Sequence, residues 1–548
     1  MAQIDLSADE EALNPPDSGC LPAWGVADLP VPPRFNLRGV IRAIGPGVII
    51  LGGSIGTGEW LLGPAVTARY GGGLLWLATV AILLQLFLNW ECARYALATG
   101  EPVFTAYMRC RPGPRFWGFI YLLLDVGMLW PAFAASVATL LAAAFLSVVK
   151  GQVGYMPGPQ DKPVYLAFAY GMMFLCVLIV SFGGKIYNAL QIAMYFMVVW
   201  ILGYLIYVDV FLVKPDTWIQ VITGFSAVGW LPREENLNWA LIAGFAAFAG
   251  AGGLSNATVG NYLRDKGWGM GKLVGAIPSA VGSQKITLYH IGAIFRPTRE
   301  NLARWQGWWK IVFVDQCVVW ACGCFLGMLL PALLTVQFVP RGTDFTSQQM
   351  QVAAIQAKGI ADAFPHARLA FWVLTLICGF WILFSTQLQT VDHVSRRWTD
   401  ILWTGSARAH QLKGHQVKYI YYGILVLYTA WGCVTLLLQQ PMTMVLIASI
   451  TGGFAMSVCA VHTVYVNRRF LPRRLWAPLW REAMLVLCAL FYITTTSLVA
   501  AGQLKKILAP KPPATRAAAP RRQGALRYHR TAVPDSLLRP IRLWSEPS

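Results

Sequence analysis

The chain has 548 residues, of which 56% are hydrophobic and only 13% are charged, and its net charge is +19. Soluble domains carry about 25% charged residues, so this composition excludes an ordinary soluble protein. In a membrane protein, Lys and Arg gather in cytoplasmic loops, and we therefore expect no nucleic-acid partner despite the positive charge. The eleven Cys are scattered without a CxxC pair, which argues against a zinc site or a disulfide framework.

Apolar runs of 18 or more residues recur along the chain, which predicts an all-α polytopic membrane protein. We expect a disordered cytoplasmic tail over 1–40, a transmembrane domain over 41–502 and a basic, Pro- and Arg-rich disordered tail over 503–548. About eleven spans are predicted, near 45–68, 73–98, 115–147, 164–182, 187–213, 238–262, 309–336, 367–391, 418–438, 442–466 and 475–501.

Loop charges predict the orientation of these spans. With the N-terminus inside the cell, the cytoplasmic connections and the N-terminal flank hold most of the 44 Lys and Arg. The positive-inside rule therefore favours a protein of the cell membrane with a cytoplasmic N-terminus. An odd number of spans would place the basic C-terminal tail outside, which the rule does not favour, so the side of that tail stays open.

The first span, 45–68, is unsuited to one unbroken helix. Five Gly lie in its middle, and each weakens a helix by about 1 kcal/mol relative to Ala. Glu59 follows Gly56-Thr57-Gly58, and an acid inside a membrane span usually faces a cavity and binds something. We predict a broken helix whose peptide groups and Glu59 form part of a binding site. The alternative is a closely packed Gly-rich helix with Glu59 paired to a Lys or Arg.

The sixth span has a matching cluster, because Gly250, Gly252 and Gly253 lie at its middle and Asn256 follows. Breaks in spans one and six, five spans apart, are typical of two five-helix inverted repeats, in which half-helix ends bind substrate and ions near the membrane midplane. The repeats would cover about 45–213 and 238–466, with an extra helix at about 475–501. Close packing through small residues is the alternative for the sixth span alone.

Five short stretches then point to a family. They are Gly45-Pro46-Gly47, Gly56-Thr57-Gly58-Glu59-Trp60, Leu74-Leu75-Trp76, Leu83-Leu84-Gln85 and Thr99-Gly100-Glu101. Over residues 45–101 the chain resembles the start of the Nramp metal-ion transporters, and the likeness is only topological up to about residue 500. The resemblance implies a LeuT-type fold, with a metal ion bound between spans one and six and often coupled to protons.

The chain departs from that family at its metal ligands. Gly56 stands where the family has a metal-binding Asp, Thr57 replaces a Pro, and Glu59 replaces a metal-binding Asn. The Met-Pro-His signature of the sixth span is absent as well. The remaining candidate ligands offer oxygen, which suits Mg or Mn better than Cu, Zn or Fe. They are Gly56, Thr57, Glu59, Gly252, Ser255 and Asn256.

Further polar residues lie inside the spans. Asp125 in the third span resembles the acid that the family places on a proton route. The alternative to a role in proton transfer is that Asp125 forms a salt bridge to Arg94 or another buried base. Glu91 and Arg94 are i, i+3 neighbours, and we expect them to pair with each other.

The eighth span ends in a polar stretch. Gln387 and Gln389 are candidates for lining the central cavity. We expect Asp392 and His393 to lie at the cytoplasmic mouth, surrounded by solvent.

Three functions stay open. The first is a secondary transporter that moves a divalent metal cation by alternating access, with proton coupling as an option. The second is a transporter of a small organic solute on the same fold, and the third is a membrane sensor or scaffold that transports nothing. We expect no enzyme, because HExxH, P-loop and nucleophile-elbow motifs are missing, and no cofactor. The expected partners are the lipid bilayer, the transported ion or solute, and protons.

Overall fold

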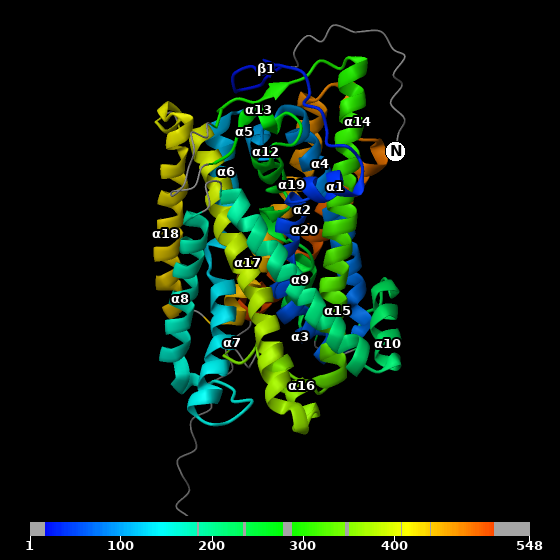
Figure 1. The fold of residues 1–548 in the computed structure, drawn as a ribbon, viewed down its shortest axis with the longest axis vertical. Helices are drawn as coiled ribbons and strands as arrows, with labels where there is room; N and C mark the ends of the chain where they lie inside the picture. Colours follow the sequence, from blue (N-terminus) through cyan, green and yellow to red (C-terminus); the bar gives the residue numbers. More distant parts are fainter. Residues whose placement is uncertain are drawn as a thin grey trace, which may run out of the picture. The chain divides into compact units, whose positions relative to one another are not determined.

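The computed structural model describes residues 17–182, 186–233, 237–277, 288–345, 350–406, 408–438 and 440–508. Residues 1–16 and 509–548 lie outside the described residues, and with them part of the predicted N-terminal tail and most of the predicted C-terminal tail. The transmembrane domain is built almost wholly from helices (Figure 1).

The first five spans follow one another from the blue to the cyan and green part of the chain (Figure 1). Their helices are α2 (Pro46–Ser54), a π-helical turn (Gly58–Leu62) and α3 (Gly63–Tyr70), then a short 3₁₀ turn (Gly72–Leu75) and α4 (Trp76–Thr99), then α6 (Pro114–Leu124), a 3₁₀ turn (Val126–Leu129) and α7 (Ala132–Val149), then α8 (Lys162–Ser181) and α9 (Ile186–Leu212).

The next six spans begin with a second interrupted helix. They are α11 (Trp239–Phe248), a 3₁₀ turn (Gly253–Ser255) and α12 (Val259–Lys266), then α14 (Arg299–Phe313), a π-helical stretch (Val314–Ala321) and α15 (Cys322–Phe338), then α17 (Arg368–Gly405), α18 (Val417–Leu438), α19 (Pro441–Phe470) and α20 (Leu479–Leu508). Shorter elements connect the spans: α1 (Leu37–Ala43), α5 (Val103–Arg109), α10 (Pro215–Ser226), α13 (Gly271–Val274), α16 (Ile355–Ala363) and the parallel strands β1 (Gly25–Val26) and β2 (Ala293–Ile294).

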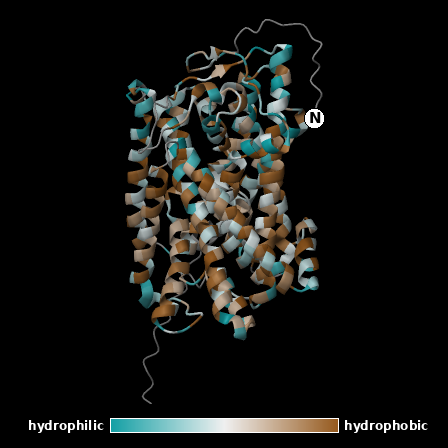
Figure 2. Ribbon diagram, viewed as in Figure 1, coloured by the Kyte–Doolittle hydropathy of each residue, from teal (hydrophilic) through white to brown (hydrophobic). Residues whose placement is uncertain are grey.

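Nine helices in the described part of the chain are long and apolar enough to cross a membrane, and two bent helix pairs raise the number to eleven. The bent pairs are Leu37–Ala43 with Pro46–Tyr70, at 60°, and Trp239–Ser255 with Val259–Lys266, at 45°. Hydrophobic residues cover most of the length of the spans, and hydrophilic residues gather toward their ends (Figure 2). The prediction of an integral membrane protein with about eleven spans is confirmed.

The broken spans lie inside the helix bundle. α2 packs against α9 and α17, and α11 packs against α19 and α4. Every residue of α2 is buried, and so is every residue of α11 from Leu241 to Phe248. Spans one and six are therefore surrounded by other helices, so their interrupted backbone is shielded from lipid.

The predicted disorder of 1–40 is wrong for residues 17–40. β1 pairs with β2, and Leu21, Trp24 and Leu29 are buried. Arg109 donates hydrogen bonds of 2.9 Å to the carbonyl oxygens of Ser18 and Pro22 and lies over the Trp24 ring. The segment is ordered because three apolar side chains leave water and a buried Arg satisfies its backbone.

Candidate functional site

The first span is interrupted at Ile55 and Gly56. α2 ends at Ser54, and the chain resumes as a π-helical turn from Gly58. Side chains from elsewhere in the chain bond the freed backbone groups. Thr386 of α17 donates to the Gly53 carbonyl oxygen at 3.1 Å, and Gln356 of the short helix α16 donates to the Trp60 carbonyl oxygen at 2.8 Å. The break is therefore a built feature of the fold, since buried polar backbone groups need partners.

The sixth span is interrupted more completely. Gly250, Gly252 and Gly253 all have positive φ, at 95°, 66° and 58°, a conformation that side-chain-bearing residues rarely adopt. Gln85 of α4 holds the opened backbone with one amide, accepting from the Ala251 N–H at 2.9 Å and donating to the Ala249 carbonyl oxygen at 2.8 Å. The prediction of broken helices in spans one and six is confirmed.

The Glu59 carboxylate joins the two breaks. One of its oxygens accepts from the Gly56 N–H at 3.0 Å, and the other accepts from the Gly250 N–H at 3.1 Å. The side chain is fully buried, and no Lys or Arg pairs with it within the described residues. Gly58 lies so close to span six that a methyl group on it would overlap the Phe248 carbonyl oxygen. The two interrupted segments therefore meet, with Glu59 between them.

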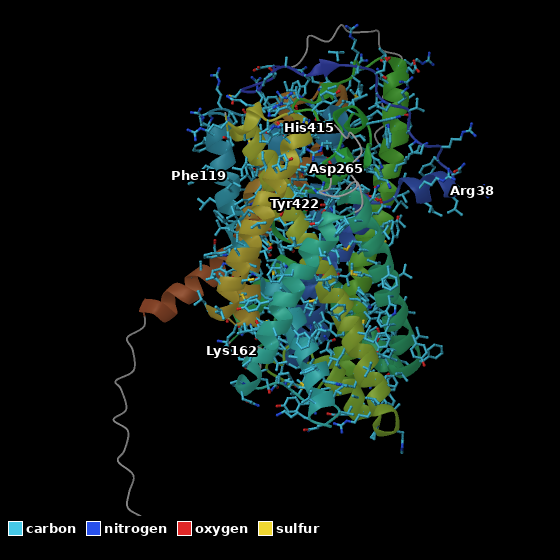
Figure 3. All side chains as sticks on the ribbon, turned by 60° about the vertical axis from the view of Figure 1, so that its left-hand side comes forward. Arg38, Phe119, Lys162, Asp265, His415 and Tyr422 are labelled. Carbon is cyan, nitrogen blue, oxygen red and sulfur yellow. The ribbon has the colours of Figure 1, made fainter. Side chains whose placement is uncertain are left out.

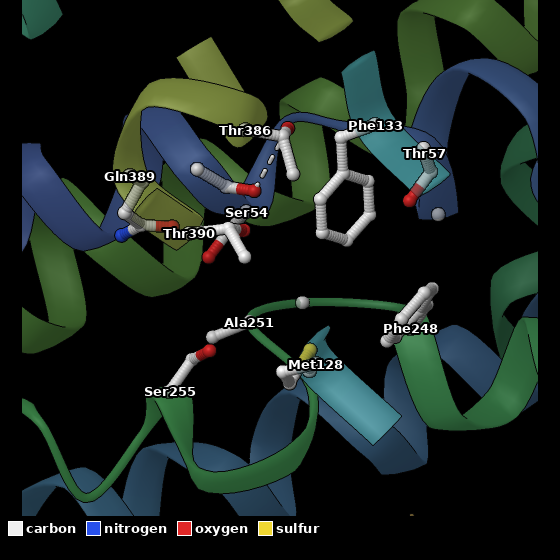
Figure 4. Close-up of a pocket in the computed structure, with 13 residues that line it drawn as sticks. Ser54, Thr57, Met128, Phe133, Phe248, Ala251, Ser255, Thr386, Gln389 and Thr390 are labelled. Carbon is white, nitrogen blue, oxygen red and sulfur yellow. Dashed lines mark hydrogen bonds between the residues drawn. The ribbon is translucent and has the colours of Figure 1, made fainter. Parts of the chain in front are cut away.

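A cavity of about 20 Å³ lies between the breaks, which is room for about one water-sized ligand (Figure 4). Its wall includes the C-terminal ends of two half-helices, at Ser54 of α2 and Phe248 of α11. Helix C-termini carry partial negative charge, which favours a cation. The polar side chains in its wall carry hydroxyl or amide groups. They are Ser54, Thr57, Ser255, Thr386, Gln389 and Thr390.

Of the predicted ligands, Thr57 and Ser255 line this cavity, as does Gln389. Gly56 and Glu59 are not in its wall, but Gly250, which donates to Glu59, is. The carboxylate thus lies one hydrogen bond behind the wall.

The other predicted positions have different surroundings. Gly252 lies in the sixth break outside the wall, and its N–H approaches the Gln85 oxygen at 3.4 Å. Gln387 accepts from the Ala134 N–H at 2.9 Å near the start of α7, so this amide holds a helix end. Asn256 donates to Asn89 of α4 at 2.8 Å, while its own amide oxygen is buried without a hydrogen-bond partner.

Thr386 and Thr390 are cavity residues that the sequence analysis did not single out. Together with Gln389 they have the spacing i, i+3, i+4, which places three side chains on one face of a helix. Gln387 directly follows Thr386 and is an i, i+3 neighbour of Thr390, so it lies beside this face. Residue type and helical spacing alone therefore could not separate Gln387 from the cavity-lining side chains.

Asp125 is paired with Arg397 of α17. The two side chains form a bidentate contact of 2.7 and 2.6 Å, and Trp398 donates to the same carboxylate at 2.7 Å. Arg94 instead pairs with Glu91 at 2.8 Å, as predicted. Asp125 therefore forms a salt bridge to a buried base other than Arg94, which was the alternative given above for this residue.

The Asp125–Arg397 pair belongs to a cluster of buried charges that joins α12, α17 and the end of α6. Arg396 contacts both Asp392 and Asp265, and Arg264 contacts Asp265 and Asp400. The expected solvation of Asp392 and His393 is wrong, since both are at most 1% exposed. α17 has 38 residues and is roughly 57 Å long, well beyond a hydrocarbon core of about 30 Å. α5, α6 and α18 pack against it, and α12 contacts its extension through Arg264 and Asp265.

No group of three or more His, Cys, Asp or Glu side chains that could hold a metal ion occurs in the part of the chain that the structure describes. A metal ion in the cavity would therefore depend on hydroxyl, amide and backbone carbonyl oxygens and on the single carboxylate behind them. Such a set of ligands is typical for hard cations.

Fold and site together define an integral membrane protein of about eleven spans, with the first and sixth spans broken around a small oxygen-lined cavity. No protein-family profile matches the sequence, and no curated protein matches it.

Solved structures of a manganese transporter from Eremococcus coleocola share this fold. One variant has a TM-score of 0.58 and 14% identity, covering 90% of this chain and 92% of the other. Its complex with an aromatic bis-isothiourea substituted compound has a TM-score of 0.57 and 15% identity, covering 92% and 93%. A further variant has a TM-score of 0.58 and 14% identity, covering 92% and 94%. At this identity the likeness establishes the fold, which is the one that the resemblance in residues 45–101 predicts.

Proposed function

We propose that the chain is a secondary transporter of a divalent metal cation and that the ion binds in the cavity between the two breaks. The observation that carries the proposal is this cavity, bounded by two half-helix C-termini and lined by oxygen-bearing side chains. Glu59 supplies the negative charge from behind the wall, and the hydroxyl groups of Thr57, Ser255 and Thr386 serve as neutral ligands. The fold shared with a manganese transporter supports the same reading.

The small volume of the cavity favours a metal ion as cargo over a small organic solute. An amino acid or amine needs many times the volume of a water molecule, whereas the cavity has about 20 Å³. Oxygen ligands favour Mn²⁺ or Mg²⁺ among divalent ions. We therefore propose one of these hard cations as cargo and the lipid bilayer as the protein's surroundings, with the N-terminus on the cytoplasmic side of the cell membrane.

We further propose that transport proceeds by alternating access and is coupled to protons. Asp125 is the candidate proton carrier, supported by its burial and by its position in a charge cluster that links α6, α12 and α17. Protonation would weaken its contact with Arg397 and so loosen these helices. Uptake that rises under an inward proton gradient is the expected behaviour.

Uptake into proteoliposomes tests the function. We expect Mn²⁺ or Mg²⁺ to enter vesicles that contain the wild-type protein, and Glu59→Gln to reduce uptake roughly tenfold or more, because ligand charge sets affinity for hard cations. Glu300→Gln is the matched control, since Glu300 is exposed and pairs only at the surface with Arg304. Uptake of an amino acid without metal uptake would favour the organic-solute alternative, and uptake of neither would favour the sensor or scaffold.

A further inference from the structure

α1 has the character of a helix that lies at a membrane surface. It directly precedes the first span and is bent by 60° from it. Phe35, Leu37 and Ile41 are 55%, 77% and 58% exposed, although all three are apolar. A short helix with exposed apolar and basic side chains beside the start of a span is typical of an interfacial helix.

A strongly basic cavity of about 580 Å³ lies between this helix, the end of α12 and Trp308 within α14. The charged side chains in its wall are Arg34, Arg38, Arg42 and Lys266. No Asp or Glu is among the described residues that line it. Figure 3 shows α1 with Arg38 at the edge of the helix bundle. Four positive charges around one opening attract an anion, above all one with several acceptor oxygens.

The wall of the cavity opposite α1 is held in place by α14 and the segment after α12. Trp268 and Trp308 pack with ring centroids 6.0 Å apart, and Trp308 donates to the Pro30 carbonyl oxygen at 2.7 Å. Lys266 donates to Gln191 at 2.9 Å. Both Trp side chains are buried, at 3% and 4% exposed, so they form a fixed wall of the cavity.

We propose that this cavity binds the phosphate group of an anionic phospholipid headgroup. Arg34, Arg38 and Arg42 bind the phosphate oxygens, and the exposed side chains of Phe35, Leu37 and Ile41 contact the acyl chains. A free phosphate offers the same kind of acceptor oxygens, with more negative charge at neutral pH, but would leave these apolar side chains in water. The position next to the first span and the paired basic and apolar surfaces of α1 therefore favour a lipid.

The test uses the full-length protein in detergent, with phosphatidylglycerol or phosphatidylcholine added in mixed micelles, and counts bound lipids by native mass spectrometry. We expect wild-type protein to retain phosphatidylglycerol in preference to phosphatidylcholine. The triple variant Arg34→Gln, Arg38→Gln and Arg42→Gln should bind phosphatidylglycerol roughly a hundredfold more weakly, since three charges near the surface are removed.

The matched control removes three other exposed Arg charges, as Arg111→Gln, Arg115→Gln and Arg299→Gln, and should bind phosphatidylglycerol like the wild type. A second variant, Phe35→Ser, Leu37→Ser and Ile41→Ser, should lose lipid binding while all basic residues remain. Inorganic phosphate and glycerol 3-phosphate provide the soluble arm, and we expect neither to displace the lipid at millimolar concentration. Displacement by either, or an unchanged lipid preference in the triple Arg variant, would overturn the proposal.

Discussion

Glu59 has a structural as well as an electrostatic task at the centre of the protein. Its two oxygens accept one N–H from each interrupted span, at 3.0 and 3.1 Å, and so hold the breaks together. A buried carboxylate is costly unless it is hydrogen-bonded, and the breaks supply the donors that an intact helix would not. Gly250 both lines the cavity and donates to Glu59, so we expect ion binding in the cavity to be sensitive to this carboxylate.

Asp125 offers a test at a single position. Asp125→Asn leaves the buried guanidinium of Arg397 without a counter-charge, and breaking a buried pair in this way costs about 3–5 kcal/mol. We expect a clear fall in the thermal unfolding temperature in detergent, and partial recovery in the double variant Asp125→Asn with Arg397→Gln.

Asp216→Asn is the control for this variant, because Asp216 is exposed and close to neither Asp125 nor Arg397 in the chain. An unfolding temperature that stays at the wild-type value, together with lost proton-driven uptake, would assign Asp125 to proton transfer alone and not to stability.

At the scale of elements, the contact between spans one and six makes a prediction about Gly58. A methyl group there would overlap the Phe248 carbonyl oxygen, which belongs to the backbone and cannot rotate away. Gly58→Ala should therefore separate the breaks, cost about 1–3 kcal/mol of stability and weaken Mn²⁺ binding. Binding and thermal unfolding in detergent measure both effects.

Gly171 in α8 is the matched control, since nothing lies within 4 Å of an added methyl group. Gly171→Ala should leave Mn²⁺ binding unchanged and, if anything, raise stability by about 1 kcal/mol through helix propensity. Equal effects of the two substitutions would mean that the close approach at Gly58 is unimportant.

The buried ion pair of Glu101 and Arg109, between α4 and the end of α5, makes a prediction about pH. Glu101, past the end of α4, accepts from Arg109 at 2.5 and 2.9 Å and from the Gly292 N–H at 2.9 Å. Burial raises its pKa, but the Arg109 charge and these hydrogen bonds outweigh burial, so the pKa lies below its usual value of 4.5. A lowered pKa stabilises the fold above about pH 4.5 and loses that contribution as pH falls toward the folded-state pKa.

We expect thermal unfolding of the wild type to become easier as the pH falls below 4.5, and Glu101→Gln to flatten this dependence. Glu300→Gln is again the control, since it removes an exposed carboxylate. An identical pH profile for wild type and Glu101→Gln would contradict the assignment.

At the scale of the whole molecule, the span count and the two breaks could be predicted because both follow from local composition. Apolar runs set the spans, and Gly clusters at 52–58 and 250–253 set the interruptions. Burial of the N-terminal segment could not be predicted, since its Pro-rich composition hides a few apolar side chains whose partners lie far along the chain. The charge cluster was missed because α17 continues past the membrane and is covered there by other helices. Which oxygens line the cavity depends on helix faces, and only the packing of α17 against α2 selects them.

The central claim is that a hard divalent cation binds where spans one and six meet. A structure determined with Mn²⁺, in which the ion is located by its anomalous scattering, tests this most directly. We predict one peak in the cavity, at ligand distance from oxygens of Thr57, Ser255 or Thr386 and next to the Glu59 carboxylate. An empty cavity in protein that takes up Mn²⁺, or a peak bound elsewhere, would contradict the account.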